Sequence, residues 1–307
     1  MNLMPITLFL LILNSPWVQA LPGGFSNCLN GPSFQKNVGL VQKAAMIGGE
    51  DRQSVEEYAR STGSTVEAVA GMFAATGVIM CGPVSATVQL TGKKNMVTTV
   101  SHAFYRVRDC RFFEPTNCTV KFPLSGSDRL YKIKSNTFES GGCTAPFKIK
   151  NKQDWAVFEL TTEVEGVTPY DVPEAPNEVA EGTAILQVAS YTDNFRPRQP
   201  SRFFQNIQNC QVRNRRSYAN ISLQTDCDTG VGASGAGQLV NINGRLTLAA
   251  ISVGGTSNLP DPRNPQDRRP PVAEYDKALH FSISVALDGD FLRILHERLG
   301  TRVSRGR

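Results

Sequence analysis

Long basic runs, long apolar runs and histidine are all scarce in this sequence of 307 residues. The net charge is +5, charged residues make up 19% of the chain, and the basic residues are scattered. This pattern indicates a solvated basic surface and no nucleic-acid partner. No run is long and apolar enough to approach the ~20 residues that a membrane-spanning helix needs. A hydrophobic content of 40% is ordinary for a globular protein with a sizeable core.

The first twenty residues are typical of a secretory signal. Residues 6–13 are apolar, and Val18-Gln19-Ala20 fits a cleavage site of small residues, although no Lys or Arg precedes the apolar run. Asn14-Ser15-Pro16 interrupts that run, which favours a cleaved signal over a membrane anchor. We therefore expect residues 1–20 to be removed and the mature protein to be secreted or periplasmic, without membrane contact.

Seven cysteines in an exported chain predict disulfides and one thiol left over. There is no CxxC motif and no histidine at ligand spacing, so we predict no metal site and no cofactor. Proximity in the sequence suggests pairing Cys110 with Cys118 and Cys210 with Cys227, although sequence alone does not fix connectivity. The cysteines are Cys28, Cys81, Cys110, Cys118, Cys143, Cys210 and Cys227.

Two short helices are expected before residue 76. Ser54-Val55-Glu56-Glu57 and Ser64-Thr65-Val66-Glu67 both have the capping-box pattern, with the turn Ser61-Thr62-Gly63 between them. A DNA-binding helix-turn-helix has this form, but export argues against it. We interpret the region as a helical extension that packs on the following domain.

From Thr76 the pattern changes to short β-rich runs, separated by Gly, Pro, Asn and Asp. Many short strands predict an all-β protein, either an antiparallel barrel or a sandwich. A helix is expected after Asp288-Gly289-Asp290, with basic residues near its end. The expected strands are 78–80, 85–90, 96–100, 130–134, 155–160, 183–189, 246–253 and 280–285.

Three segments carry, in chain order, the residue types that nucleophilic acyl transfer requires: 98–102, 154–157 and 232–236. Of the three histidines, only His102 ends a β-branched run that could aim it into a cleft. Taken singly, His102 fits a buried structural histidine, Asp154 a capping residue and Ser234 an ordinary glycine-rich turn. Their ordered combination favours catalysis.

The same segments resemble the motifs of trypsin- and chymotrypsin-like serine peptidases, especially the bacterial subgroup that includes glutamyl endopeptidases. The family's Thr-Ala-Ala-His-Cys corresponds to residues 99–103, its Asp-Ile-Ala-Leu to 154–157 and its Gly-Asp-Ser-Gly-Gly to 232–236. The resemblance covers about 76–299, and it implies two antiparallel six-stranded β-barrels with a C-terminal helix. Ala233 replaces the aspartate that pairs with a new N-terminus in zymogen-activated members, so that activation route should be absent.

The resemblance and side-chain chemistry together give each residue a role. Ser234 would be the nucleophile, and His102 the base that takes its proton and passes it to the leaving amine. Asp154 would fix the imidazole tautomer. The backbone amides of Gly232 and Ser234 would form the oxyanion hole.

Side-chain preference depends on the segment around Asp228, which stands where trypsin-like members place a pocket-floor carboxylate. Such a carboxylate would select Arg or Lys. Glutamyl endopeptidases also carry Asp-Thr here, as in Asp228-Thr229, but the histidine of their later pocket strand has no counterpart in residues 250–255. Ser252, Val253 and Gly254 on that strand would bind the substrate. We favour a basic side chain, with a small or apolar one as the alternative.

The sequence thus predicts an exported serine endopeptidase that cleaves peptide or protein substrates through an acyl-enzyme. The expected organisation is a signal at 1–20, a helical extension or propeptide at 21–75, a peptidase domain at 76–299 and a basic tail at 300–307. One alternative is a catalytically inactive homologue with a binding or structural role. An esterase of the α/β-hydrolase fold would have the opposite order, Ser, Asp, His. The oligomeric state stays open.

Overall fold

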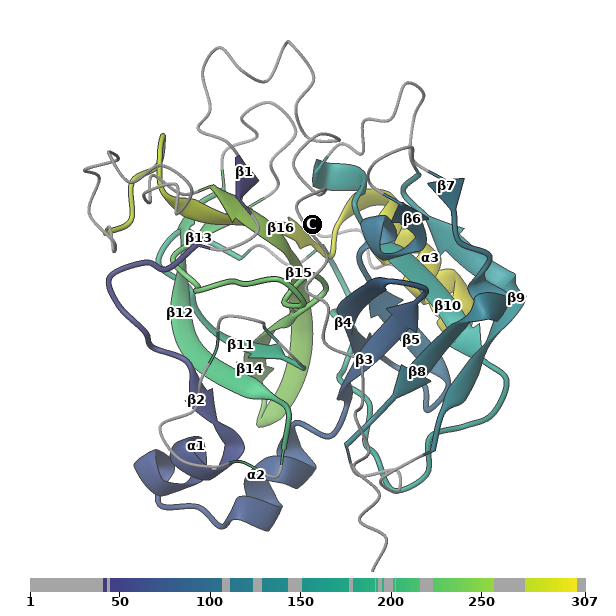
Figure 1. The fold of residues 1–307 in the computed structure, drawn as a ribbon, viewed down its shortest axis with the longest axis horizontal. Coiled ribbons are helices and arrows are strands. Elements are labelled where there is room, and N and C mark those ends of the chain that lie inside the picture. The colour runs from purple at the N-terminus through teal and green to yellow at the C-terminus, as the bar shows by residue number, and fades with distance from the viewer. Residues whose placement is uncertain are drawn as a thin grey trace, which may run out of the picture.

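The computed structural model describes residues 41–42, 45–106, 111–123, 129–142, 151–176, 179–190, 192, 195, 201, 203–215, 223–256 and 274–302. The expected signal at 1–20, most of the tail at 300–307, and Cys28, Cys110 and Cys143 lie outside these residues. Two β-barrels stand side by side, and the N-terminal barrel is drawn in blue and teal (Figure 1).

The N-terminal barrel is closed and antiparallel, with the strand order β10-β5-β4-β3-β8-β9. Its interior is apolar, with Ile79, Val88 and Phe158 fully buried. Short runs of β-branched and apolar residues favour strands, so most strands of this barrel could be predicted from the sequence. The strands are β3 (Thr76–Cys81), β4 (Val84–Leu90), β5 (Met96–Thr99), β8 (Cys118–Lys121), β9 (Tyr131–Ser140) and β10 (Ala156–Leu160).

The C-terminal barrel follows the order β15-β14-β11-β12-β13-β16 and closes because β15 also pairs with β16. Two short strands from the N-terminal side join it: β1 (Val41–Gln42) on β15 and β2 (Gln53–Ser54) on β12. The prediction of two antiparallel six-stranded barrels is confirmed. The barrel strands are β11 (Ala184–Ala189), β12 (Asn206–Asn214), β13 (Leu223–Thr225), β14 (Gly237–Ile242), β15 (Arg245–Thr256) and β16 (Phe281–Ala286).

Helices α1 (Val55–Thr62) and α2 (Val66–Met72) lie against the C-terminal barrel, below β12 in Figure 1. Ser54 forms the expected capping box with Glu57. The second capping box is wrong: Thr65, not Ser64, caps α2 by accepting a hydrogen bond from the amide of Ala68. The helix begins one residue later than expected, so no glutamate stands at the third helical position to complete a box.

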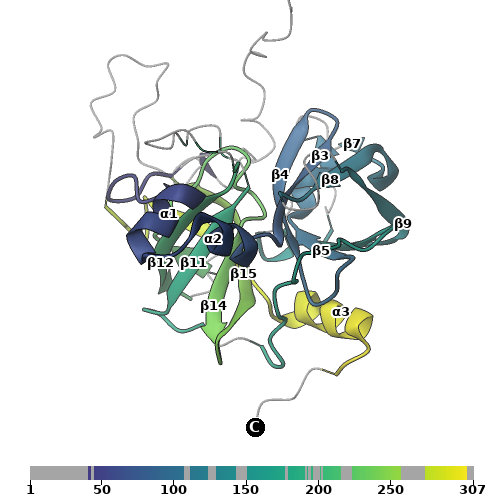
Figure 2. The same ribbon diagram turned by 90° about the horizontal axis from the view of Figure 1, so that it is seen from below.

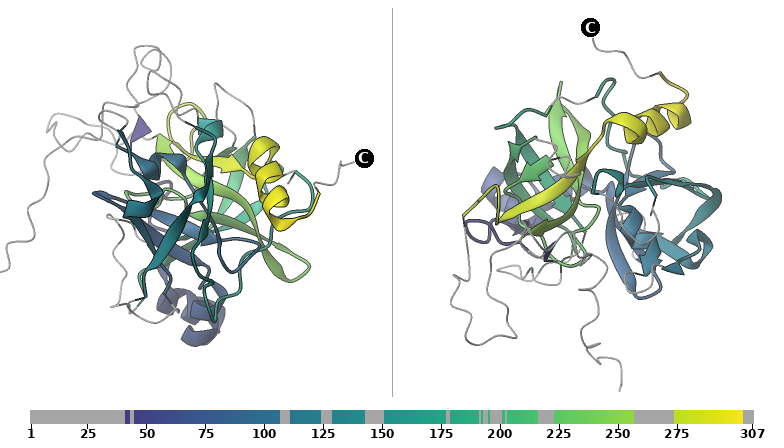
Figure 3. Two further views of the ribbon diagram at one scale, coloured as in Figure 1. Left: turned by 90° about the vertical axis from the view of Figure 1, so that its right-hand side faces the viewer. Right: turned by 90° about the horizontal axis from the view of Figure 1, so that it is seen from above.

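Helix α3 (Gly289–Leu299) follows the C-terminal barrel in the chain but packs on the N-terminal barrel (Figures 2 and 3). The rings of Trp155 and Phe291 stack with centroids 5.1 Å apart. Arg298 forms an ion pair of 2.6 Å with Glu139 on β9. Of the helices in the described part of the chain, none has the length and hydrophobicity to cross a membrane.

The remaining elements are short. They are β6 (Tyr105–Arg106), β7 (Arg111–Phe112) and the 3-10 turns η1 (Ser101–Phe104), η2 (Pro115–Asn117) and η3 (Asn151–Gln153).

Two disulfides join the described residues. Cys210 pairs with Cys227, as expected. The pairing of Cys118 with Cys110 is wrong, because Cys118 is bonded to Cys81. Strands β3 and β8 are antiparallel neighbours with Cys81 opposite Cys118, and their Cα atoms are 4.4 Å apart. Sheet register, which proximity in the sequence does not reveal, therefore decides this bond.

Candidate active site

His102 and Asp154 meet because β5 and β10 are antiparallel neighbours. Thr99 at the end of β5 lies opposite Ala156 at the start of β10. The residues just after one strand and just before the other are thereby brought together. His102 Nδ1 lies 2.6 Å from Asp154 Oδ2. Oδ1 of the same carboxylate accepts hydrogen bonds from the backbone N–H of His102, at 3.0 Å, and the hydroxyl of Ser101, at 2.9 Å.

The electrostatics of this pair favour the ionised carboxylate. Burial by itself would raise the pKa of Asp154, but the His102 charge and the hydrogen bonds from His102 and Ser101 outweigh it and lower the pKa. For His102, burial would lower the pKa, and the charge and hydrogen bond of Asp154 outweigh burial and raise it. The His102 side chain remains 26% exposed, so one part of the ring is open to a substrate or to solvent.

The Ser234 turn belongs to the C-terminal barrel but is bound to strand β4 of the other barrel. The backbone N–H of Thr87 donates to the Ser234 carbonyl at 2.7 Å, and the Thr87 hydroxyl donates to the Gly232 carbonyl at 2.8 Å. Gln89 Nε2 donates to the Gly235 carbonyl at 3.0 Å. The hydroxyl of Thr99 donates to the Thr87 carbonyl at 2.6 Å. This chain of bonds links the Ser234 turn to β5, which leads into His102.

The turn has room only for glycine at position 235. Its φ is 84°, and an added Cβ would lie 2.1 Å from the Thr87 carbonyl oxygen and 2.5 Å from Thr99 Oγ1. Glycine therefore allows the two barrels to approach here.

Within the described residues, the Ser234 hydroxyl donates to the Val253 carbonyl at 3.3 Å and makes no hydrogen bond to His102. The structure thus brings His102 and Asp154 of the N-terminal barrel into contact, while Ser234, on a turn of the C-terminal barrel that is bonded to β4, makes no direct bond to the histidine. No hydrogen bond among the described residues uses the backbone N–H of Gly232 or Ser234. Gly232 has a φ of 99°, a value that places its peptide in an orientation rare for other residues.

The predicted substrate strand lies beside this turn. The Ser252 backbone exchanges hydrogen bonds with Gly235, at 2.7 Å, and Ala236, at 2.9 Å. A Cβ added to Gly254 would meet no atom within 4 Å, so the space beside it is open.

Asp228 is buried, and its carboxylate is bonded to the N-terminal segment. Oδ1 accepts the N–H of Ile47 at 2.8 Å, and Oδ2 accepts the N–H of Asp51 at 3.2 Å. Burial raises the pKa of Asp228 to about 7, opposed by these two hydrogen bonds and by the charge of Arg52. The next residue, Thr229, exchanges backbone hydrogen bonds with Ala45. Both oxygens of the expected pocket-floor carboxylate thus already have partners.

Comparison with known proteins gives a structural likeness only. No protein-family model and no curated protein matches the sequence. A solved structure of a Glu endopeptidase in complex with MPD is similar, with a TM-score of 0.57 and 16% sequence identity. The likeness covers 83% of this chain and 100% of that chain. This chain has the fold of the trypsin-like serine peptidases.

In this trypsin-like fold, sequence reasoning missed the polar residues that support the site. Thr87 and Gln89 on β4 bind the Ser234 turn, and Ser101 binds Asp154. All three are fully buried. The sequence signal was present in β4, where Thr and Gln alternate with Ala, Val and Leu. A buried strand with a polar face requires polar partners.

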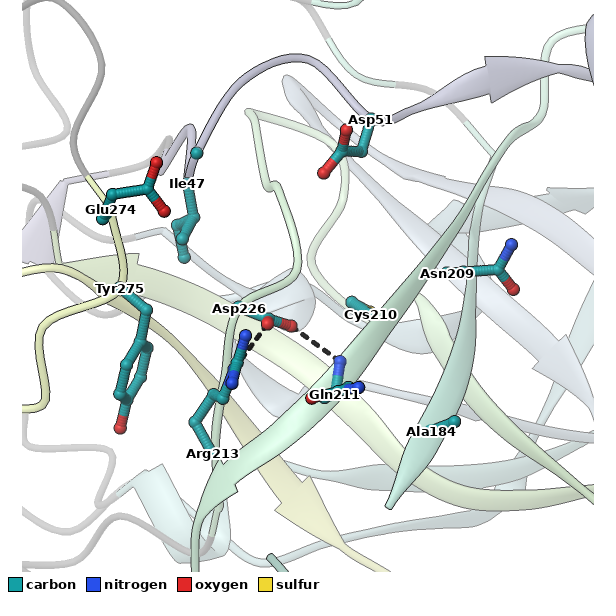
Figure 4. Close-up of a pocket in the computed structure, with 11 residues that line it drawn as sticks. Ile47, Asp51, Ala184, Asn209, Cys210, Gln211, Arg213, Asp226, Glu274 and Tyr275 are labelled. Atoms are coloured by element: carbon teal, nitrogen blue, oxygen red, sulfur yellow. Dashed lines mark hydrogen bonds and ion pairs between the residues drawn. The ribbon is translucent and has the colours of Figure 1, made fainter. Parts of the chain in front are cut away.

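A pocket of about 410 Å³ opens elsewhere on the C-terminal barrel (Figure 4). Arg213 and Asp226 form an ion pair of 2.6 Å within it, and Asp226 also accepts the N–H of Gln211. None of the predicted site residues lines this pocket, but Ile47 and Asp51 do. Across the described residues, no group of three or more His, Cys, Asp or Glu side chains is arranged to hold a metal ion.

Proposed function

We propose that this protein is an exported serine endopeptidase that uses His102, Asp154 and Ser234. The observation that carries the proposal is the buried Asp154 carboxylate, which has three hydrogen-bond contacts, one of them with Nδ1 of His102. An ionised carboxylate only accepts hydrogen bonds, so Nδ1 must carry the proton. Nε2 is then unprotonated in the neutral ring and available as a base.

The reaction begins when the Ser234 hydroxyl turns from the Val253 carbonyl toward His102 Nε2. As Oγ attacks the carbonyl carbon of the scissile peptide, its proton passes to Nε2. The N–H groups of Gly232 and Ser234, which have no acceptor in the described part of the chain, would donate to the oxyanion, a contribution of about 3 kcal/mol for each such donor. The imidazolium then protonates the leaving amine, and water attacks the acyl ester by the reverse proton path.

The substrate would be an extended peptide beside Ser252, Val253 and Gly254. Asp228 and Thr229 would bind the substrate side chain before the scissile bond and select Arg or Lys over a small or apolar residue. Binding of a basic side chain requires the Asp228 carboxylate to be released from the N–H groups of Ile47 and Asp51. The two disulfides fit an oxidising compartment and support the proposal of a secreted or periplasmic enzyme.

The test is a fluorophosphonate probe together with dye-labelled casein. Wild-type protein should be labelled at Ser234, and Ser234→Ala should lose both labelling and casein cleavage while keeping its melting temperature. The matched control is Ser61→Ala, at an exposed helical serine, which should change neither activity. A folded wild-type protein that the probe does not label would support the alternative of an inactive homologue.

A further inference from the structure

We propose that residues 41–42 and 45–51, called here the inhibitory segment, hold the enzyme in a self-blocked state. The segment would take the strand edge and side-chain pocket that a peptide substrate needs. This inference rests on the proposed peptidase function and concerns regulation of the same site.

The first observation is the position of β1. Strand β15 has β16 along one edge as far as Thr256, while on its other edge the pairing with β14 ends at Ile251. Beyond that point β1 occupies the edge, with Gln42 opposite Gly255. The pairing is antiparallel, so β1 runs in the direction of Ser252, whose backbone is bonded to the Ser234 turn. An extended peptide that added a strand at this edge would have the same backbone pairing.

The second observation is that Ala45 fills the space between the two predicted pocket walls. Its N–H donates to the Thr229 carbonyl at 3.2 Å, and its carbonyl accepts the Thr229 N–H at 2.8 Å. A Cβ added to Gly255 would lie 2.7 Å from the Cβ of Ala45. Ala45 is fully buried, so no side chain of a substrate can pass between residues 229 and 255 while it stays.

The third observation is that buried polar groups at this site bind the segment's backbone. Asp228 accepts the N–H groups of Ile47 and Asp51, and His280 Nε2 donates to the Met46 carbonyl at 2.7 Å. Backbone groups are the same in every peptide, so these contacts suit an extended chain of many sequences.

The segment can leave without opening the barrel. On its far side, Ile47, Gly48 and Asp51 line the pocket of Figure 4, so this side of the segment faces a hollow and not the barrel interior. Gly48 and Gly49 have φ values of 74° and 139°, which gives this stretch backbone freedom. Beyond it, the Arg52 side chain is buried and bonded to Thr192, which anchors the chain before β2.

The experiment uses full-length protein with Ala45→Glu, which places a charge in the buried space between Thr229 and Gly255 and should expel the segment. Its matched control is Ala68→Glu, the same change at an exposed helical position. We expect Ala45→Glu to raise cleavage of dye-labelled casein at least tenfold. The rate of Ser234 labelling by a small fluorophosphonate, which does not need the strand edge, should change less than twofold. Ala68→Glu should match wild type in both assays.

Two further measurements distinguish release of the inhibitory segment from misfolding of the Ala45→Glu variant. Ile47→Pro removes the N–H that donates to Asp228 and should also raise casein cleavage, about threefold or more. A synthetic peptide of residues 41–47, added to the Ala45→Glu protein, should restore the block, while the peptide carrying the same Ala45→Glu change should not. If Ser234 is labelled but neither variant gains activity, self-blocking is wrong and the proposed function stands. If no form is labelled, the proposed function itself fails.

Discussion

Replacing Asp154 by asparagine tests the proposed catalytic pair with almost no change in shape. The asparagine oxygen can still accept the hydroxyl of Ser101 and the N–H of His102, which now bind Oδ1. The amide nitrogen replaces Oδ2, 2.6 Å from His102 Nδ1, and it can only donate. The histidine proton must therefore move to Nε2, where it prevents the ring from accepting the proton of Ser234.

The expected magnitude follows from the loss of the base. With the wrong tautomer, kcat should fall about 10⁴-fold, equivalent to about 5 kcal/mol in barrier height. Two of the three hydrogen bonds to residue 154 remain, so the melting temperature should change by less than about 4 °C. Steady-state cleavage of dye-labelled casein by an otherwise activated form gives the rate, and differential scanning calorimetry gives the stability.

A matched control is Asp171→Asn, because Asp171 pairs with Arg245 at the surface and has no role in the proposed chemistry. That variant should keep its rate within about twofold. If the folded Asp154→Asn protein retains a tenth or more of wild-type kcat at neutral pH, the tautomer argument is refuted.

Two other outcomes follow from the geometry. Because Asp154 raises the pKa of His102 and only the neutral ring accepts a proton, kcat/KM should rise with pH through an apparent pKa above 6.5. A value of kcat/KM that does not change between pH 5 and pH 9 would contradict this. Gly235→Ala should lower the free energy of unfolding by about 2–5 kcal/mol in urea titration, from strain and from overlap with Thr87. Gly142→Ala, with a φ of 89° and open space, should lose only about 1–2 kcal/mol; equal losses would show that the barrel contact is unimportant.

Much of the fold could be predicted because the N-terminal barrel has a dry interior. Strands such as β4 and β10 could be predicted from the sequence because their β-branched and apolar residues pack in one core. Strand β12 was missed because buried glutamines share the interior of the C-terminal barrel with apolar residues. Gln208 is buried there and binds the backbone of Asp228, so a polar residue stands at an inward position where an apolar alternation is expected.

The local part of the site could also be predicted, whereas its long-range contacts could not. The positions of His102 and Asp154 follow from strand ends that local patterns reveal. The partners of Asp228 come from a segment 181 residues away in the chain, and the bond between Cys81 and Cys118 depends on sheet register. No local pattern encodes such pairings, because they are decided by how the barrels and the N-terminal segment assemble.

The place of helix α3 has a consequence for synthesis on the ribosome. The N-terminal barrel emerges first, but Trp155 lacks its stacking partner until Phe291 has been made. The whole C-terminal barrel must be translated in the meantime, so the first barrel leaves the exit tunnel with an uncovered aromatic surface. We therefore expect the nascent chain to need a chaperone until α3 has been translated, and not only until the N-terminal barrel is complete.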